Sequence, residues 1–268
     1  KVLVIGAGNM GLTYSEGMAD SSLLGKQKLR IYDTDPNTIE RLRKTQKFDV
    51  YTSLEDGLPK SDIIFLAVKP YHCEGLFKDM KPLINNEQIF VSLMAGVSID
   101  TIQKGLGVKK VIRTMPNLPC LVLAGVFAYR ANKNCTSNDL RNFLNLVQTV
   151  GTAIKVLKES DFDYVTALSG SGPAFLGEFI NAQLVYAKTK GISSKLAKQL
   201  ILNTIVGTSK YLSETLIKPD EFVKMVSSPG GTTEAGIRVL KNKKFENIII
   251  KCLNSASSKS KKISKKLK

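Results

Sequence analysis

Short apolar runs alternate with helical patterns over about the first 159 residues of the chain. The runs are four to seven residues long and rich in Val, Ile and Leu, which predicts strands at Val2–Ile5, Leu29–Asp33, Asp62–Val68, Ile89–Met94 and Val111–Met115. Parallel strands need long crossover connections, and helices between strands supply them. The alternation therefore predicts an α/β, Rossmann-type doubly wound sheet with mainly parallel strands.

Three helix starts between these strands carry capping signals. Asp35 precedes a proline, Ser98 precedes an apolar residue, and Thr136 is followed by Asp139 at capping-box spacing. Only ten residues, with two prolines and a glycine, separate Val111–Met115 from the next apolar run, Val126–Arg130. That gap is short for a helical crossover, so we predict an antiparallel edge strand there and a last short strand at Ala153–Leu157.

Strand signals stop near residue 160. Glycine and proline punctuation predicts helices at Asp161–Leu168, Gly172–Lys190, Ser194–Glu214, Pro219–Val226 and from Thr232 to the C-terminus. The predicted helix over Gly172–Lys190 has apolar residues on more than one side. Such a helix needs burial on several sides, which favours packing against a partner subunit. We predict two domains, residues 1–159 with the sheet and an all-α dimerisation domain at 160–268.

The closing stretch Ser255–Lys268 contains six lysines among fourteen residues, in a chain of net charge +16. A disordered basic tail is one interpretation. The other is a terminal helix with a solvated lysine face, because apolar residues from Ile248 to Ile263 recur near helical spacing. Positive charge could attract nucleic acid, a membrane or a small anion, and charge alone does not choose among them.

The amino-acid composition of the 268-residue chain limits the kinds of catalytic and metal site that it can form. The four cysteines are widely spaced and His72 is the only histidine, which disfavours Ser-His-Asp triads and histidine metal cages, so we expect no metal site. No apolar run reaches the roughly 18–20 residues of a membrane span, and the first residues lack a basic-then-apolar secretory start. We expect a cytoplasmic protein without membrane partners.

The first predicted strand leads into Gly6, Ala7, Gly8, Asn9, Met10 and Gly11, and then into a helical pattern. Glycines at this spacing allow a tight turn, close approach of a pyrophosphate and close helix–strand packing. The helix N-terminus then binds the anion with its free N–H groups. The strand before and the helix after favour a dinucleotide site over a ligand-free glycine turn.

Asp33 lies 22 residues after Gly11, where an acidic side chain would bind the adenosine ribose of the dinucleotide. Asp33 and Asp35 would repel a 2′-phosphate, and no arginine directly follows Asp33. The cofactor is therefore NADH or NADPH, with Asp33 favouring NADH. Alternatively, Asp33 only caps the turn into the next helix.

Further loops concentrate Gly, Pro, Ser and Thr at strand ends and helix starts. Ligands in open α/β sheets bind beyond the carboxyl ends of strands, so these loops would line the nicotinamide half of the cofactor, although each alone could be an ordinary turn. They are Ala67-Val68-Lys69-Pro70, Ser92–Gly96 with Ala95, and Arg113–Asn117. In the helical half, Ala167–Ala174 and Val226–Thr233 are similar, and the Pro-Gly-Gly turn of the second suits a carboxylate or is a plain interhelical turn.

Over nearly its whole length the chain resembles pyrroline-5-carboxylate reductases. The matching segments are Gly6–Gly11, Ala67–Pro70, Met115–Pro119, Asp163–Phe175, and Ser228–Thr233 followed by Gly236. The resemblance implies a Rossmann domain, a helical domain that interlocks with a second copy, an imine site at the dimer interface, and possible higher oligomers of dimers.

The resemblance also implies roles for individual residues. By the resemblance, the cofactor-loop positions are Ala67, Lys69, Met115, Pro116 and Asn117. Val68, Pro70 and Ala95 are expected to line the cofactor because of the place of their loops at strand ends. Ser228 and the backbone of Gly230, Gly231 and Thr232 would bind the substrate carboxylate, and Thr233 would contact the imine nitrogen, unless it is a helix N-cap. The chain departs from relatives with a 2′-phosphate arrangement after the second strand. His72 is expected at the surface or behind the site.

Two other functions stay open at this point. A 2-hydroxy or β-hydroxy acid dehydrogenase would need a base, for which Lys188, Lys190 and Lys195 are available in polar surroundings. A dinucleotide-sensing or nucleic-acid-binding protein would use the positive charge without catalysis, but would have no need of the Pro-Gly-Gly turn. We expect an imine substrate, 1-pyrroline-5-carboxylate, and no nucleic-acid partner.

Overall fold

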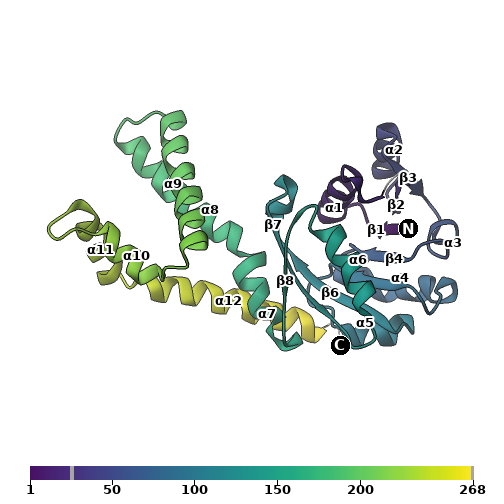
Figure 1. Ribbon diagram of the computed structural model, residues 1–268. Coiled ribbons are helices and arrows are strands. Elements are labelled where there is room, and N and C mark those ends of the chain that lie inside the picture. Colours follow the sequence, from purple (N-terminus) through teal and green to yellow (C-terminus); the bar gives the residue numbers. More distant parts are fainter. Residues whose placement is uncertain (25–26, 267–268) are drawn as a thin grey trace. The chain divides into compact units, whose positions relative to one another are not determined.

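The computed structural model describes residues 1–24 and 27–266, and it divides the chain into two compact units. Unit 1 comprises residues 1–171 together with the C-terminal segment from Ser255, and unit 2 comprises Gly172–Asn254. Figure 1 shows the sheet of unit 1 and the helices of unit 2. Residues 160–171 belong to unit 1, and the domain boundary at 159/160 stays a prediction.

The sheet of unit 1 has eight strands in the order β3-β2-β1-β4-β5-β6-β7-β8. All neighbouring pairs are parallel except β6 and β7, which are antiparallel. The strands are β1 (Val2–Ile5), β2 (Leu29–Tyr32), β3 (Phe48–Tyr51), β4 (Ile63–Leu66), β5 (Ile89–Ser92), β6 (Lys110–Pro116), β7 (Gly125–Ala131) and β8 (Gly151–Lys155). The predicted Rossmann-type doubly wound sheet is confirmed.

Alternating residues of the central strands face two separate cores. Val2 and Val4 of β1 join the core on one face of the sheet, whereas Leu3 and Ile5 join the core on the other. Successive side chains of a strand point to opposite faces, so an uninterrupted apolar run is buried on both. This explains why the strands read as continuous apolar segments in the sequence.

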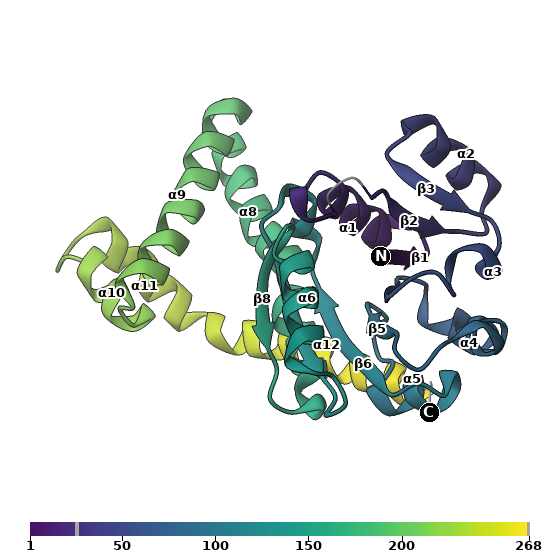
Figure 2. The same cartoon turned by 45° about the vertical axis from the view of Figure 1, so that its right-hand side comes forward.

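Helices cover both faces of the sheet. One core includes side chains of α1 (Asn9–Ala19) and α6 (Ser137–Val147), and the other those of α3 (Leu54–Gly57), α4 (Cys73–Met80) and α5 (Ile99–Leu106). Figure 2 shows α1 and α6 on one side of the strands and α4 and α5 on the other.

The predicted helix caps are present. The Asp35 side chain accepts from the N–H groups of Asn37 and Thr38 at the start of α2 (Pro36–Thr45). Thr136 and Asp139 form a reciprocal capping box at the start of α6. These local contacts fix where the helices begin.

The structure corrects two predictions for the sheet. The sequence analysis missed β3, whose four residues include Asp49 and so lack a continuous apolar run. The strand over Val126–Arg130 is antiparallel to β6 as predicted, but it is not an edge, because β8 pairs with it in parallel. The connection between β6 and β7 is too short to contain a crossover helix, so β7 runs antiparallel to β6. The connection between β7 and β8 contains the helix α6, so β8 can pair with β7 in parallel at the edge of the sheet.

The remaining helices follow β8. Unit 1 continues with a 3₁₀ turn at Glu159–Asp161, α7 (Phe162–Val165) and a π-helical turn at Thr166–Gly170. Unit 2 contains α8 (Gly172–Thr189), α9 (Ser194–Thr215), α10 (Pro219–Val226) and α11 (Thr232–Asn242). The helix α12 (Phe245–Lys266) begins in unit 2 and ends in unit 1.

The C-terminal stretch is helical, so the disordered-tail interpretation is wrong for the described residues. The single helix predicted from Thr232 onward is instead two helices, α11 and α12. Lys244 has a φ of +54° between them, a conformation that an α-helix does not contain. Charge and apolar spacing indicated helix correctly, but they did not reveal the break.

Within residues 1–24 and 27–266, no helix combines the length and the apolar character needed to span a bilayer. In the same described residues, no three His, Cys, Asp or Glu side chains lie close enough to share a metal ion.

Candidate functional site

The first half of the candidate site lies at the carboxyl ends of parallel strands in unit 1. The strand β1 pairs with β2 on one side and with β4 on the other, so the chain order reverses at β1. Such a reversal opens a crevice between the loops that follow the two strands, and ligands of open α/β sheets bind there. Gly6, Asp33 and Ala67 directly follow β1, β2 and β4.

The glycine loop is built by close backbone packing. A Cβ on Gly11 would lie 1.9 Å from the Gly6 carbonyl oxygen, and a Cβ on Gly6, whose φ is +96°, would lie 3.0 Å from the Ala67 oxygen. A Cβ on Gly8 would meet no atom within 4 Å. Two glycines are therefore needed for packing, and the third leaves open space at the start of α1.

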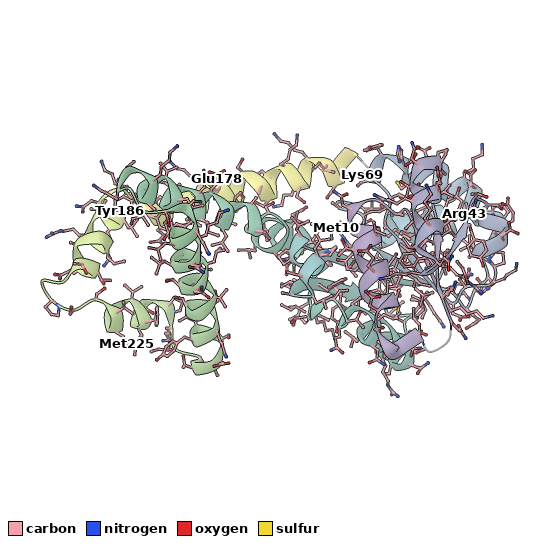
Figure 3. The ribbon with its side chains drawn as sticks, turned by 90° about the horizontal axis from the view of Figure 1, so that it is seen from above. Met10, Arg43, Lys69, Glu178, Tyr186 and Met225 are labelled. Carbon is pink, nitrogen blue, oxygen red and sulfur yellow. The ribbon has the colours of Figure 1, made fainter. Side chains whose placement is uncertain are left out.

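The start of α1 offers main-chain donors to an anion. Gly8 is the N-cap residue and has no side chain to cap the helix, and Asn9 and Met10 begin it. The first N–H groups of a helix have no acceptor within it, and the helix dipole adds partial positive charge. Figure 3 labels Met10 at this helix start and Lys69 in the loop after β4. This geometry fits a pyrophosphate.

Asp33 links two loops through its carboxylate. The Ala7 N–H donates to Asp33 Oδ2 at 2.6 Å, and the Asp35 N–H donates to Oδ1 at 2.9 Å. Asp33 therefore organises the glycine loop and also caps the turn into α2, as the alternative interpretation expected. Each carboxylate oxygen can accept more than one hydrogen bond, so both can still bind ribose hydroxyls.

A cavity of about 780 Å³ borders Asp33 and continues along α2. Its lining brings together Asp33, Thr34, Pro36, Ile39, Glu40, Arg43, Lys44 and Thr52. Arg43 is exposed, and Lys44 pairs with Glu40 at 2.6 Å. Hydrogen bonds from the Thr38 hydroxyl and N–H hold the pKa of the Asp35 carboxyl below its usual value, so Asp35 stays negative beside this cavity.

Arg43 is a residue that the sequence analysis missed. It was sought directly after Asp33, but α2 brings it to the same cavity from ten residues further along. The signal was present in the helix spacing, because Ile39 and Arg43 are four residues apart and share a face of α2. Both an acid and a cation therefore line this cavity.

Two further loops lie at the same sheet edge. After β4, Lys69 is exposed in extended backbone, and Pro70 starts a 3₁₀ turn that ends at His72. Among the aromatic rings of the described residues, the His72 ring contacts only that of Tyr71, edge to face, with 4.4 Å between the ring centres. His72 is exposed, as expected. After β5, Ala95 is half-buried in a tight turn with Gly96, whose φ is +80°.

The third loop joins the end of β6 to the π-helical turn. The buried Asn117 side chain accepts from the Val126 N–H at 2.9 Å and donates to the Ser169 carbonyl at 3.2 Å. A Cβ on Gly170 would lie 2.7 Å from Cε of Met115. Asn117 thus holds the neighbouring turn through its side chain, and π-helical turns are frequent at functional sites.

The Pro-Gly-Gly turn lies in unit 2, between α10 and α11. Gly230 has a φ of +73°, and Gly231 is the N-cap of α11. The Gly230 N–H donates to Oε2 of Glu234 at 2.8 Å, and the Gly231 N–H donates to the Ser228 carbonyl at 3.0 Å. The chain itself therefore uses two predicted carboxylate donors, and a side-chain carboxylate already occupies one of them.

Thr233 lies at the second position of α11 and is half-buried. It is not the N-cap, so the alternative structural role weighed for it is wrong. Ser227, beside the turn, has the only fully buried side-chain oxygen without a hydrogen-bond partner in the described residues.

Two family models match the chain. Residues 159–263 match the pyrroline-5-carboxylate reductase dimerisation family, and residues 1–96 match the family of NADP oxidoreductases dependent on coenzyme F420. The two matches fall on the helical part and on the glycine-loop part of the sheet.

Named relatives cover almost the whole chain. The pyrroline-5-carboxylate reductase of Aquifex aeolicus is 35% identical over 98% of this chain and 97% of its own length. The enzyme of that name from Escherichia coli is 32% identical over 99% and 98%. A crystal structure of Plasmodium falciparum pyrroline carboxylate reductase with NADP bound has a TM-score of 0.89 at 29% identity, covering 98% of each chain.

Replacing Asp33 by Asn should shift the preference of the protein toward NADPH. The change removes a negative charge near the 2′ position while keeping an acceptor for a backbone N–H. One unit charge at about 4 Å is worth about 1 kcal/mol even in water, so the ratio of Kd values for the two dinucleotides should change about fivefold. Fluorescence titration of both dinucleotides measures it, with the exposed Asp56→Asn as control. An unchanged ratio would remove Asp33 from cofactor selection.

Proposed function

The chain belongs to the pyrroline-5-carboxylate reductase family, and we propose that it reduces 1-pyrroline-5-carboxylate to L-proline, the last step of proline biosynthesis. The observation that supports this proposal is the presence, in one chain of this family, of two glycine turns that each open a helix. One is the glycine loop at β1, and the other is the Pro-Gly-Gly turn before α11.

The residues of unit 1 fit a nicotinamide dinucleotide. The cradle made by Gly6, Gly8 and Gly11 leaves open space at the start of α1, where a pyrophosphate would be bound by main-chain N–H groups. We propose that Asp33 binds the adenosine ribose and favours NADH, while Arg43 lies at the edge of the same cavity. When bound, the reduced dinucleotide supplies the hydride.

We propose that the substrate is held by groups of the Pro-Gly-Gly turn and α11. The N–H groups of Thr232 and Thr233, at the positive end of α11, bind its carboxylate. The Thr233 hydroxyl aligns the nitrogen of the protonated imine. The imine carbon accepts the hydride and the nitrogen keeps its proton, so no strong acid is required. Orientation of this kind can lower a barrier by about 7–11 kcal/mol.

We propose that the protein acts as a homodimer that associates through unit 2. Fully buried apolar side chains in unit 2 are limited to Ala187 and Ala197 within residues 172–254. Tyr186 of α8 and Met225 of α10, labelled in Figure 3, are 63% and 62% exposed. A helical unit without a core of its own needs a partner surface to bury these side chains. A cytoplasmic location is part of the same proposal.

The central test is oxidation of NADH and NADPH by the purified chain with 1-pyrroline-5-carboxylate and, separately, with a panel of keto acids. Turnover of the imine alone is the expected result. A hydroxy acid dehydrogenase would act on the keto acids instead, and a DNA-binding protein would show salt-sensitive retention on DNA without turnover.

Thr233→Ala should lower kcat/KM for the imine about tenfold or more, because a hydrogen bond to a charged group is worth about 1.5–3 kcal/mol. Thr233→Ser keeps the hydroxyl and serves as the matched control, with activity near that of the unaltered protein. Steady-state kinetics with the imine as varied substrate measure both. Equal loss in both variants would indicate a packing role for the threonine methyl group.

Glu234→Ala should lower the KM for the imine at least about threefold, since it frees the Gly230 N–H and removes a competing carboxylate. The KM for the dinucleotide should not change. Glu234→Gln, which keeps an acceptor but no charge, should give an intermediate value. A higher KM in Glu234→Ala would mean that Glu234 instead holds the turn in its binding conformation.

Val206→Glu should convert the dimer to monomers and abolish imine reduction. Val206 is 64% exposed on α9, and an unpaired carboxylate in an apolar interface is strongly unfavourable. Light scattering coupled to size-exclusion chromatography measures the mass. Lys198→Glu places the same side chain at an exposed polar position of the same helix and should leave the dimer intact. A Val206→Glu protein that remains dimeric would contradict this interface.

A further inference from the structure

The end of α12 packs on the rest of unit 1 through buried serines, and Lys261 adds a contact at the edge of this face. From Ser255 onward the helix belongs to unit 1. Ser257 and Ser260 are buried although the surrounding residues Lys259 and Lys262 are exposed. Buried hydroxyls in a lysine-rich helix mark the side that packs against protein, because the charged side stays in water. The helix end is therefore a packed element of unit 1.

A carboxylate of α7 holds this helix end. The Ser260 hydroxyl donates to Oδ1 of Asp163 at 2.6 Å, and the Ser264 hydroxyl lies 3.4 Å from the same oxygen. Lys261 Nζ donates to the Tyr164 hydroxyl at 3.0 Å and lies 4.7 Å from the centre of its ring. Hydrogen bonds to a carboxylate are short and strong, so the position of α12 on α7 is well defined.

The same helix end lies directly on the loop between β5 and α5. Gly96 is buried in the turn of this loop, with a φ of +80°. A Cβ on Gly96 would lie 3.1 Å from Cγ2 of Ile263 and 3.3 Å from the backbone nitrogen of Ser264. The helix thus packs against the main chain of the turn that contains Ala95, one of the expected cofactor positions.

Glu159, which precedes α7 in the sequence, holds the end of this loop at Ile99. Glu159 Oε1 accepts from the Ile99 N–H at 2.8 Å and from Arg113 Nη1 at 3.0 Å. Arg113 is buried in β6, with its guanidinium carbon 4.4 Å from the centre of the Phe162 ring. The loop is therefore fixed at Ile99 by Glu159, Met94 and Val97 are buried in the core on either side of the turn, and the end of α12 covers the turn at Gly96.

We propose that the end of α12 positions the cofactor loop, with Ser260 and Ile263 as positioning residues for dinucleotide binding. Asp163 anchors the helix through Ser260, and Ile263 presses on Gly96, so that the turn keeps one conformation before the dinucleotide binds. A binding loop that is already ordered loses less entropy on association. The inference rests on the proposed function, since it assumes that Ala95 lines the cofactor.

The first test compares Ser260→Ala with Ser258→Ala in the full-length chain. Ser258 is exposed on the same helix and is the matched control. Loss of one hydrogen bond should raise the Kd for NADH or NADPH, measured by fluorescence titration, about two- to tenfold. The KM for the imine should stay close to that of the unaltered protein, and the melting temperature should fall by only several degrees. An unchanged Kd, or equal increases in Kd and imine KM, would overturn the proposal.

The second test is a double-mutant cycle on the contact itself. Gly96→Ala adds a methyl group 3.1 Å from Cγ2 of Ile263, and Ile263→Ala removes that tight contact, whereas the strain from the φ of +80° and the contact with the Ser264 backbone are the same in both backgrounds. Gly96→Ala should therefore weaken dinucleotide binding less in the Ile263→Ala protein than in the unaltered one. Strictly additive effects on Kd would show that the two residues act independently and would refute the contact.

The titrations separate this proposal from the proposed function, because they measure binding without turnover. A protein that binds dinucleotide but does not reduce the imine would contradict the reductase activity and would still test α12. A fully active protein whose Ser260→Ala and Ile263→Ala variants bind dinucleotide normally would contradict only the role of α12.

Discussion

At the carboxyl end of β1, backbone segments pack against one another very closely. The rest of unit 1 depends on this constraint. Gly11 packs on the Gly6 carbonyl, and Gly6 packs on Ala67, at separations that no larger side chain allows. Only this approach leaves the first N–H groups of α1 free to face a ligand. The strand order reverses at the same strand, because β1 pairs with β2 on one side and with β4 on the other.

Polar side chains at this sheet edge mostly hold loops in place. Asp33 bonds two backbone N–H groups, Asn117 joins β7 to the π-helical turn, and Glu159 joins α5 to Arg113. Each of these side chains connects segments that are distant in the sequence. A site built from main-chain donors needs such supports, because backbone groups bind in the right direction only if their loops are rigid.

Unit 2 differs from unit 1 because it has almost no apolar core of its own. Its helices expose apolar side chains along α8 and α9 and bury almost none within one chain. Its turn carries a carboxylate, Glu234, on one of the N–H groups expected to bind a ligand. Unit 2 therefore leaves apolar surface for a partner to cover, and Glu234 would compete with any carboxylate that binds at this turn.

The sequence alone determined the fold class, most strands and helix starts, and the two glycine turns, because these depend on local periodicity, caps and backbone freedom. It could not determine β3, the outer position of β8 or the break at Lys244, which depend on pairing and packing between distant segments. The spacing along α2 could have placed Arg43 near Asp33. Tertiary structure alone brought Ile263 onto Gly96, since residues 167 positions apart meet only after the chain has folded.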